Sequence, residues 1–288
     1  MTMQAWPDVA VIIPALNVEA TIAAQLRALA AQEYAGRWQV LVANNGCTDG
    51  TRSIVHAFAT DLPLRWIDAT ERRGINHARN RGAQEADADI LLFCDGDDVV
   101  ADGWIEAMVA AIDGHDAVGG AIATVIGGRV VSPPHLPRNL ATPEWLPSPI
   151  GANCGVRREV WERLGGFDES LDRGACDDTD LFWRVQLAGG SVATAPGAVI
   201  GYAVRDDVRD RAKKSYRSTR EMARLHRRFK PHGHPRRSGV TVAKNWAWVL
   251  VNLPRAVVSP RFRSRYLPAA AQPIGRLAGS VRYRTVYL

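Results

Sequence analysis

Short apolar runs alternate with amphipathic stretches along the first part of the chain. The run 9–13 predicts a strand that ends at Pro14, and the apolar spacing over 21–32 predicts a helix. Further strands are predicted at 39–43, 64–67 and 90–94, and further helices at 51–58, 76–85 and 104–112. Strands that alternate with helices indicate an α/β fold with a mostly parallel central sheet flanked by helices.

The pattern is less regular beyond residue 112. A strand is predicted near 117–125, and the stretch 127–151 holds six of the chain's 16 prolines. That stretch is either a lid over a ligand or a plain surface connection. Helices are then predicted at 158–164 and 179–187, and a strand at 191–202 that is broken at Pro196-Gly197.

Charge divides the chain at about residue 204. Residues 1–204 carry 15 Lys/Arg against 26 Asp/Glu, whereas residues 205–288 carry 21 against 4. The first part is therefore expected to be an acidic α/β domain, and the second a basic helical extension. An acidic domain that binds an anion needs a cation to do so, and a basic extension needs an anionic partner.

An acidic cluster follows the apolar strand at 90–94. Asp95, Asp97 and Asp98 come directly after it, and Gly96 lets the backbone turn tightly. Ligands of parallel sheets bind beyond the carboxyl ends of the strands, where the loops 14–19 and 44–49 are also expected. Carboxylates without cysteine suit Mg²⁺ or Mn²⁺. A solvated acidic turn is the other interpretation, and the cluster alone does not decide between them.

Six segments resemble, in the same order, motifs of the family 2 glycosyltransferases. The resemblance covers about residues 8–204 and implies the GT-A nucleotide-binding fold. The segments are Val11-Ile12-Ile13-Pro14-Ala15-Leu16-Asn17-Val18-Glu19, Gly46-Cys47-Thr48-Asp49-Gly50-Thr51, Ala78-Arg79-Asn80-Arg81-Gly82, Asp95-Gly96-Asp97-Asp98, Gly165-Gly166-Phe167-Asp168-Glu169 and Asp177-Asp178-Thr179-Asp180-Leu181. One motif would be weak, but six in order are specific.

The resemblance implies a role for individual residues. Asp97 would coordinate the divalent cation, Asp95 would contact the metal or the donor ribose, and Asp98 would anchor the turn. Asp178 matches the family's catalytic base, although by local pattern Asp177 or Asp178 equally suits the N-cap of the helix at 179–187. The remaining donor-binding candidates are Pro14, Asn17, Glu19, Asn44 and Arg79.

Two positions depart from the family pattern. Asn44 stands where the family commonly has an aspartate that reads the nucleotide base, which puts a preference for uridine in doubt. Tyr202 stands where the family often has the histidine of a His-x-x-Arg motif, so the metal would lack one protein ligand. Trp145 and Trp183 would either stack against a sugar or pack internally.

The expected activity is an inverting, metal-assisted transfer of a sugar from a nucleotide-sugar donor to a hydroxyl of a glycan or lipid-linked acceptor, as in the synthesis of cell envelope polysaccharides. The alternative is a nucleotide-sugar-binding homologue with weak or no transferase activity. A nucleotidyltransferase is disfavoured, because the N-terminal part holds no basic Gly-rich phosphate loop.

The basic extension holds a Trp-rich amphipathic segment at 240–258. No uninterrupted apolar span of membrane length occurs there, so a transmembrane helix is not expected. An amphipathic segment beside many cations suits an anionic membrane surface, which is one expected partner. Packing of the segment against the α/β domain is the other interpretation. Nucleic acid is not expected, since no recognised binding motif accompanies the charge. Absence of a signal peptide pattern and four scattered cysteines predict a cytoplasmic protein, peripheral on the inner face of the cell membrane if the extension binds there.

Overall fold

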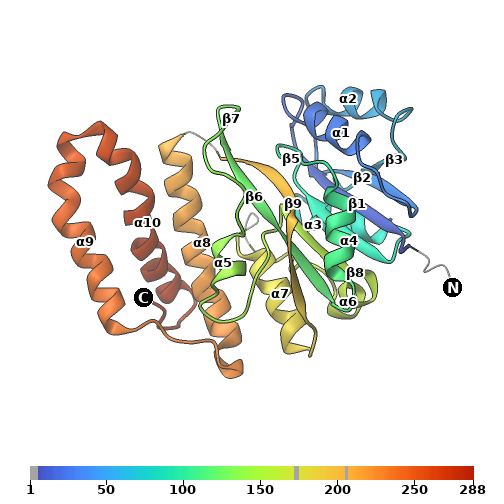
Figure 1. The fold of residues 1–288 in the computed structure, drawn as a ribbon. Helices are drawn as coiled ribbons and strands as arrows, with labels where there is room; N and C mark the ends of the chain where they lie inside the picture. The colour runs from blue at the N-terminus through green and yellow to red at the C-terminus, as the bar shows by residue number, and fades with distance from the viewer. Residues whose placement is uncertain (1–5, 172–174, 205–206) are drawn as a thin grey trace. The chain divides into compact units, whose positions relative to one another are not determined.

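The computed structural model describes residues 6–171, 175–204 and 207–288. The chain divides into two compact units, Met1–Val204 and Arg205–Leu288, here called the α/β unit and the helical unit. Each is described by itself (Figure 1).

The described residues of the α/β unit form one sheet of nine strands. Its order is β3-β2-β1-β4-β8-β6-β9-β5, and β7 pairs with β6. The first four strands in this order are parallel: β3 (Leu64–Asp68), β2 (Trp38–Asn44), β1 (Val9–Ala15) and β4 (Ile90–Cys94). In the other half β8 is antiparallel to both neighbours, and β6 is parallel to β9. The strands of that half are β5 (Val99–Val100), β6 (Ala117–Ile126), β7 (Arg129–Val130), β8 (Asn153–Arg157) and β9 (Val192–Ala203).

Helices cover both faces of this sheet. Val11 and Ile13 of β1 pack in one apolar cluster, beneath α1 (Ile22–Ala30), α2 (Thr51–Ala57) and α4 (Trp104–Ile112). Ala10 and Ile12 point to the opposite cluster, beneath α3 (Ile75–Gln84), α6 (Arg158–Leu164) and α7 (Asp177–Leu187). Successive strand residues face opposite sides, so a fully buried β1 serves both cores. The predicted α/β fold with a flanked central sheet is thus confirmed (Figure 1).

The strand β1 continues one residue past Pro14, where the sequence predicts its end. The N–H of Val9 donates to the carbonyl of Arg37, and the carbonyl of Ala15 accepts from Asn45, so odd-numbered residues of β1 bond towards β2. The missing N–H of Pro14 therefore faces the β4 side, where pairing has already ended at Ile12. No ladder hydrogen bond is lost, and the strand tolerates the proline.

The central strand β8 has no counterpart among the predicted strands. Asn153, fully buried, holds it in place: its Nδ2 donates to the carbonyls of Ala121 (2.8 Å) and Ala198 (2.9 Å), and its Oδ1 accepts from Trp104 Nε1 at 2.8 Å. A Cβ on Gly120 would overlap this amide. The strand is thus fixed by tertiary hydrogen bonds, to which local propensity is secondary.

The proline-rich stretch 127–151 is ordered against α7. It contains β7 and the short helix α5 (Arg138–Ala141). Trp183 Nε1 donates to the carbonyl of Leu146 at 3.0 Å, and Gln186 Nε2 to that of Pro147 at 2.8 Å. These bonds fasten the end of the stretch to the helix that carries the Asp177-Asp178 motif.

The described residues of the helical unit form three long helices, in agreement with the predicted helical extension, whose number of helices the sequence did not indicate. They are α8 (Val208–Phe229), α9 (Gly239–Val258) and α10 (Pro260–Arg282), with a short 3₁₀ helix η2 (Lys230–His232) after α8. Gly275 and Gly279 let α10 lie directly against the backbone of α8, because a Cβ at either position would overlap it. None of the helices in the described ranges combines the length and apolarity needed to span a bilayer.

Candidate active site

Parallel strands bring polar residues to one edge of the sheet. Ala15 at the end of β1 lies opposite Asn44 at the end of β2, and Asn44 lies opposite Asp68 at the end of β3. The next parallel strand, β4, ends at Cys94 and leads straight into Asp95. The loops that follow these strands therefore open on the same edge, as expected for a ligand site in an open α/β sheet.

The loops after β1 and β2 are fastened to each other. Asn17, with a left-handed φ of 54°, accepts a hydrogen bond from Thr48 N at 2.8 Å. The carboxylate of Glu19 accepts from Gly50 N at 2.6 Å. The structure thus uses both side chains to shape this wall of the site, and Pro14 lies buried within β1 rather than in the loop.

Asn44 caps its own turn. Its Oδ1 accepts from Gly46 N at 3.1 Å and from Cys47 N at 2.8 Å. Its Nδ2 has no protein partner among the described residues, so the amide can still donate to a ligand. The neighbouring Asn45 is buried, and its Nδ2 donates to the carbonyls of Ala69 and Arg72. Of the two amides, only that of Asn44 is available.

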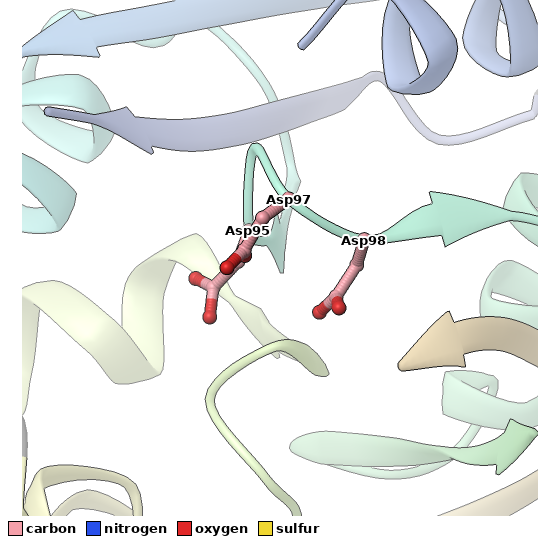
Figure 2. Close-up of side chains that lie close together, drawn as sticks. All are labelled: Asp95, Asp97 and Asp98. Carbon is pink, nitrogen blue, oxygen red and sulfur yellow. The ribbon is translucent and has the colours of Figure 1, made fainter. Parts of the chain in front are cut away.

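The three aspartates after β4 meet as the sequence predicts. One ligand oxygen from each of Asp95, Asp97 and Asp98 lies within 4.8 Å of the others, and Figure 2 shows the three side chains leaving one turn towards the same side. Asp97 is exposed, whereas buried Asp98 accepts from Ala203 N of β9 at 2.8 Å. Thr21 Oγ1 donates to the Gly96 carbonyl at 2.9 Å and holds the turn from the other side. The turn is therefore fixed before any ligand arrives.

Arg79 on α3 joins this turn to the start of α7. Its Nη2 lies 2.9 Å from Asp95 Oδ1, and its Nη1 lies 2.7 Å from Asp177 Oδ2. The side chains of Arg79 and Asp177 are each only 4% exposed. Although burial alone would lower the pKa of Arg79, Asp95 and Asp177 raise it above its usual value. A permanently charged guanidinium thus holds two carboxylates 82 residues apart in sequence.

This geometry changes the interpretation of Arg79. The sequence offers it as a candidate contact for donor phosphate or base, with a solvated arginine as the other interpretation, but both of its terminal nitrogens are occupied inside the protein. Its described contacts give it a positioning role instead.

The α7 helix begins two residues earlier than predicted, at Asp177. Its N-cap is Cys176 in a left-handed conformation, without a side-chain capping hydrogen bond, so neither Asp177 nor Asp178 is the N-cap. Both lie with Asp180 in the first turn, where negative charge is favoured by the helix dipole. Burial raises the pKa of Asp177 to about 6, with Arg79 opposing this rise and Asp178 adding to it.

Asp178 is the more accessible of this pair. It is half-buried, and its Oδ2 accepts from Gly151 N at 3.0 Å while its Oδ1 accepts from Thr179 N at 2.6 Å. A carboxylate can accept about four hydrogen bonds, so both oxygens retain acceptor capacity. Two backbone N–H groups therefore orient the Asp178 carboxylate and leave it able to accept further hydrogen bonds.

Gly151 completes this arrangement, and no sequence pattern pointed to it. Besides its bond to Asp178, it lies against Arg79: a Cβ here would be 2.9 Å from Nη1 and 3.1 Å from Cζ. Burial raises the pKa of the Cys154 thiol in β8, with Arg79 opposing the rise and Asp178, Asp95 and Asp177 adding to it.

A second connection between α3 and the loop 165–169 was also not predicted. Asn80 exchanges hydrogen bonds with the backbone of Phe167, and its Nδ2 also reaches Glu169 Oε1 at 2.9 Å. His77 Nδ1 lies 3.0 Å from Glu169 Oε2. Two of the motifs recognised separately in the sequence are therefore one packing unit that fixes α3, and with it Arg79.

The remaining candidates lie at the margins. Trp183 is 5% exposed and packs edge-to-face on Trp145 with ring centroids 4.8 Å apart, so it serves packing rather than sugar stacking. Tyr202 is half-buried in β9, directly before the Ala203 that holds Asp98. Arg205, the expected end of the His-x-x-Arg position, lies outside the described residues.

Replacing Gly151 with alanine tests how tightly this centre is packed. Gly151→Ala is expected to lower the free energy of unfolding by about 1–3 kcal/mol, because the added methyl group displaces the Arg79 guanidinium. Denaturant titration measures the change. Gly197→Ala is the matched control, since its Cβ would meet only Ala107 at an ordinary 3.6 Å. Equal stability of the two variants would mean that Arg79 can move freely.

Comparison with known proteins identifies relatives of this chain. A family model described as "Glycosyl transferase family 2" matches residues 10–165. Glycosyltransferase AglE of Haloferax volcanii is 33% identical over 66% of the chain and 64% of AglE, so the match spans just under two thirds of that relative. The succinoglycan biosynthesis protein ExoM of Rhizobium meliloti is 29% identical over 71% of each chain.

Among solved structures, the mannosyltransferase PcManGT of Pyrobaculum calidifontis, in complex with GDP-Man and Mn²⁺, has a TM-score of 0.70. The alignment covers 98% of this chain and 88% of that one, at 23% sequence identity. At that identity the likeness shows a shared fold.

Proposed function

The chain belongs to glycosyltransferase family 2, and from this premise we propose that its α/β unit transfers a sugar from a nucleotide-sugar donor to an acceptor hydroxyl, with inversion at the anomeric carbon. The observation that carries the proposal is the bridge through Arg79. It joins the acidic turn, suited to a diphosphate-bound cation, to the helix start that presents Asp178. The two groups that such a transfer requires thus lie on one network.

The acidic turn suits a divalent cation, Mg²⁺ or Mn²⁺. Its donor set is hard carboxylate oxygen, and its three side chains point the same way (Figure 2). Asp97 would be the principal protein ligand because it is exposed, and Asp95 would share its carboxylate between the metal and Arg79. Asp98, already bonded to Ala203, keeps the turn in place. When bound, the cation neutralises the charge that develops on the departing diphosphate.

Asp178 would act as the general base. The acceptor oxygen attacks the anomeric carbon as the bond from that carbon to the diphosphate oxygen breaks, and the hydroxyl proton passes to the Asp178 carboxylate. A single in-line displacement inverts the anomeric configuration. The adjacent Asp177 is unsuited to this role, because it is buried and paired with Arg79.

The donor nucleotide would lie over the ends of β1 and β2. We assign base contact to Asn44, whose Nδ2 is available, and wall formation to Asn17 and Glu19, which fasten the first loop, whereas Pro14 is the buried strand residue that leads into it. Arg79 contributes by fixing Asp95 rather than by touching the donor. An amide at position 44 can form hydrogen bonds with bases other than uracil. The nucleotide of the donor is therefore to be identified by screening several nucleotide sugars.

The acceptor proposed is a glycan or a lipid-linked hydroxyl, within cell envelope polysaccharide synthesis. Support comes from the similarity to ExoM, whose name assigns it to succinoglycan biosynthesis. We place the reaction in the cytoplasm, at the inner face of the membrane, with the helical unit as an extension of the catalytic domain. None of the four cysteines forms a disulfide, which agrees with a reducing compartment.

Donor binding without turnover is the alternative function. Asn44 and Tyr202 favour it, because both depart from the family pattern. The discriminating experiment is a nucleotide-release screen of the purified full chain against several nucleotide sugars and acceptor glycans, with Mg²⁺ or Mn²⁺ present. Acceptor-dependent release supports transfer. Binding of a donor without any release would establish the alternative.

Removing the metal is expected to abolish release reversibly. EDTA should stop the reaction and excess Mn²⁺ should restore it, and Asp97→Asn should lower kcat/KM about a hundredfold because one charged ligand is lost. Asp102→Asn is the control: this exposed carboxylate lies five residues beyond Asp97, outside the acidic turn. Undiminished activity in EDTA would refute the metal assignment without touching the proposal for Asp178.

A further inference from the structure

One face of α9 is apolar and open to solvent. With successive residues about 100° apart around the helix axis, the exposed apolar side chains of this face fall within a sector of about 120°. We call it the α9 face; its members, all exposed, are Val240, Ala243, Ala247, Leu250, Val251, Pro254, Val257 and Val258. Exposed apolar surface of this extent on one helix marks a binding surface.

The opposite face of α9 packs against α10 within the helical unit. Val249 and Ala256 are its only buried residues, and both lie against α10. Tyr266 Oη donates to the Val249 carbonyl at 3.0 Å, and Arg263 Nε donates to the Ala256 carbonyl at 3.0 Å. The α9 face therefore points away from the helix that α9 packs on.

Tryptophan is not the centre of this surface, although the sequence drew attention to it. Trp248 lies outside the apolar sector, and its ring stacks on Tyr266 with centroids 5.7 Å apart. The α9 face itself consists of valine, leucine, alanine and proline.

Charge favours an anionic partner for the α9 face. Neither α9 nor α10 contains an acidic residue, and Lys244 and Arg255 border the apolar sector on one side. Residues 205–288 carry 21 Lys/Arg against 4 Asp/Glu. Two copies meeting through this face would bring like charges together, whereas an anionic surface would attract them.

We propose that α9 lies along an anionic lipid bilayer, with the α9 face inserted at the headgroup level and the bordering Lys244 and Arg255 against lipid phosphates. A helix with an apolar face, bordered by cations and too polar to span, has the character of an interfacial helix. The proposal deepens the membrane location given above and rests on none of the transfer chemistry. It fails or holds independently of Asp178 and the metal.

Vesicle sedimentation tests the proposal with the full chain and without donor or acceptor. Vesicles of equal parts phosphatidylglycerol and phosphatidylcholine should pellet the protein, and pure phosphatidylcholine should pellet much less. Val251→Asp, at a position 77% exposed, should weaken binding to the anionic vesicles at least about tenfold, because it removes an inserted side chain and adds a repelled charge. Raising the salt concentration should release the wild type.

Val286→Asp is the matched control. It changes the same residue type, 71% exposed, beyond the end of α10 and away from the α9 face. It should retain most of the binding, and unchanged unfolding midpoints show that both variants fold. The proposal is overturned if the wild type does not pellet with anionic vesicles, if both variants lose binding equally, or if size-exclusion chromatography shows a dimer that Val251→Asp dissociates.

Discussion

Asp178→Asn is expected to lower kcat about a thousandfold while donor affinity changes by no more than about twofold. The amide cannot take the proton of the acceptor hydroxyl, and the donor is assigned to the acidic turn and the β1 and β2 loops. Turnover at saturating donor and calorimetric titration of the donor nucleotide separate the two effects. The substitution also turns one oxygen that accepts from Gly151 or Thr179 into a donor, at a cost of about 1 kcal/mol in stability.

Asp113→Asn provides the comparison for this variant. It neutralises an exposed carboxylate at the end of α4. The net charge therefore changes by the same amount as in Asp178→Asn, while the residues of the site stay unchanged. Its kcat should equal that of the wild type. Equal turnover by the two variants would assign proton removal to another group.

Arg79→Ala is expected to lower the free energy of unfolding by about 3–5 kcal/mol, because it leaves the buried carboxylate of Asp177 without its counter-ion. Activity should fall as well, since Asp95 and the start of α7 lose their common anchor. Arg79→Lys should recover only part of the stability, because one ammonium cannot match both carboxylates with the geometry of a guanidinium. Urea titrations of the three proteins measure the series.

Arg81→Ala is the control on the same helix. Arg81 is partly exposed and pairs with Glu71 and Glu85 at the surface, so its removal should cost less than about 1 kcal/mol. A loss in Arg79→Ala no larger than in Arg81→Ala would show that the bridge adds nothing to stability.

The penalty in Arg79→Ala should also depend on pH. Burial already raises the pKa of Asp177 to about 6 with Arg79 present, and removing the cation removes the opposing influence. A carboxyl whose pKa is raised on folding favours the folded state when protonated, and this contribution is lost as pH rises through the folded pKa. The difference from wild type is therefore expected to be smaller at about pH 5 than at about pH 8.

The elements that the sequence predicted well have strong local patterns. Strand β4 is a continuous apolar run, and helices α4 and α6 have periodic apolar positions; all three have the predicted bounds. Strand β8 had no such pattern, since Asn153 and Gly155 have low strand propensity. Its position between β4 and β6 is fixed by partners distant in sequence, which a local pattern does not contain.

The candidate site likewise has features that the sequence could predict and features that it could not. The aspartates of the acidic turn are adjacent in sequence, so their proximity could be predicted from one strand end. The bridge from Arg79 to Asp177 spans 98 residues, and the contact of Gly151 with it is visible only after folding. The family resemblance pointed to the separate segments, but not to the hydrogen bonds that join them.

The side chain that holds β8 also links three positions of the fold that are far apart in sequence. The amide of Asn153 donates to Ala121 and Ala198 and accepts from Trp104, and it occupies the space that a side chain at residue 120 would need. Aspartate would offer no donors there, and glutamine would be one methylene too long. Substituting Trp104 or Gly120 is therefore expected to displace Asn153 as well, so the three positions form one packing unit outside the acidic turn and the Asp177-Asp178 motif.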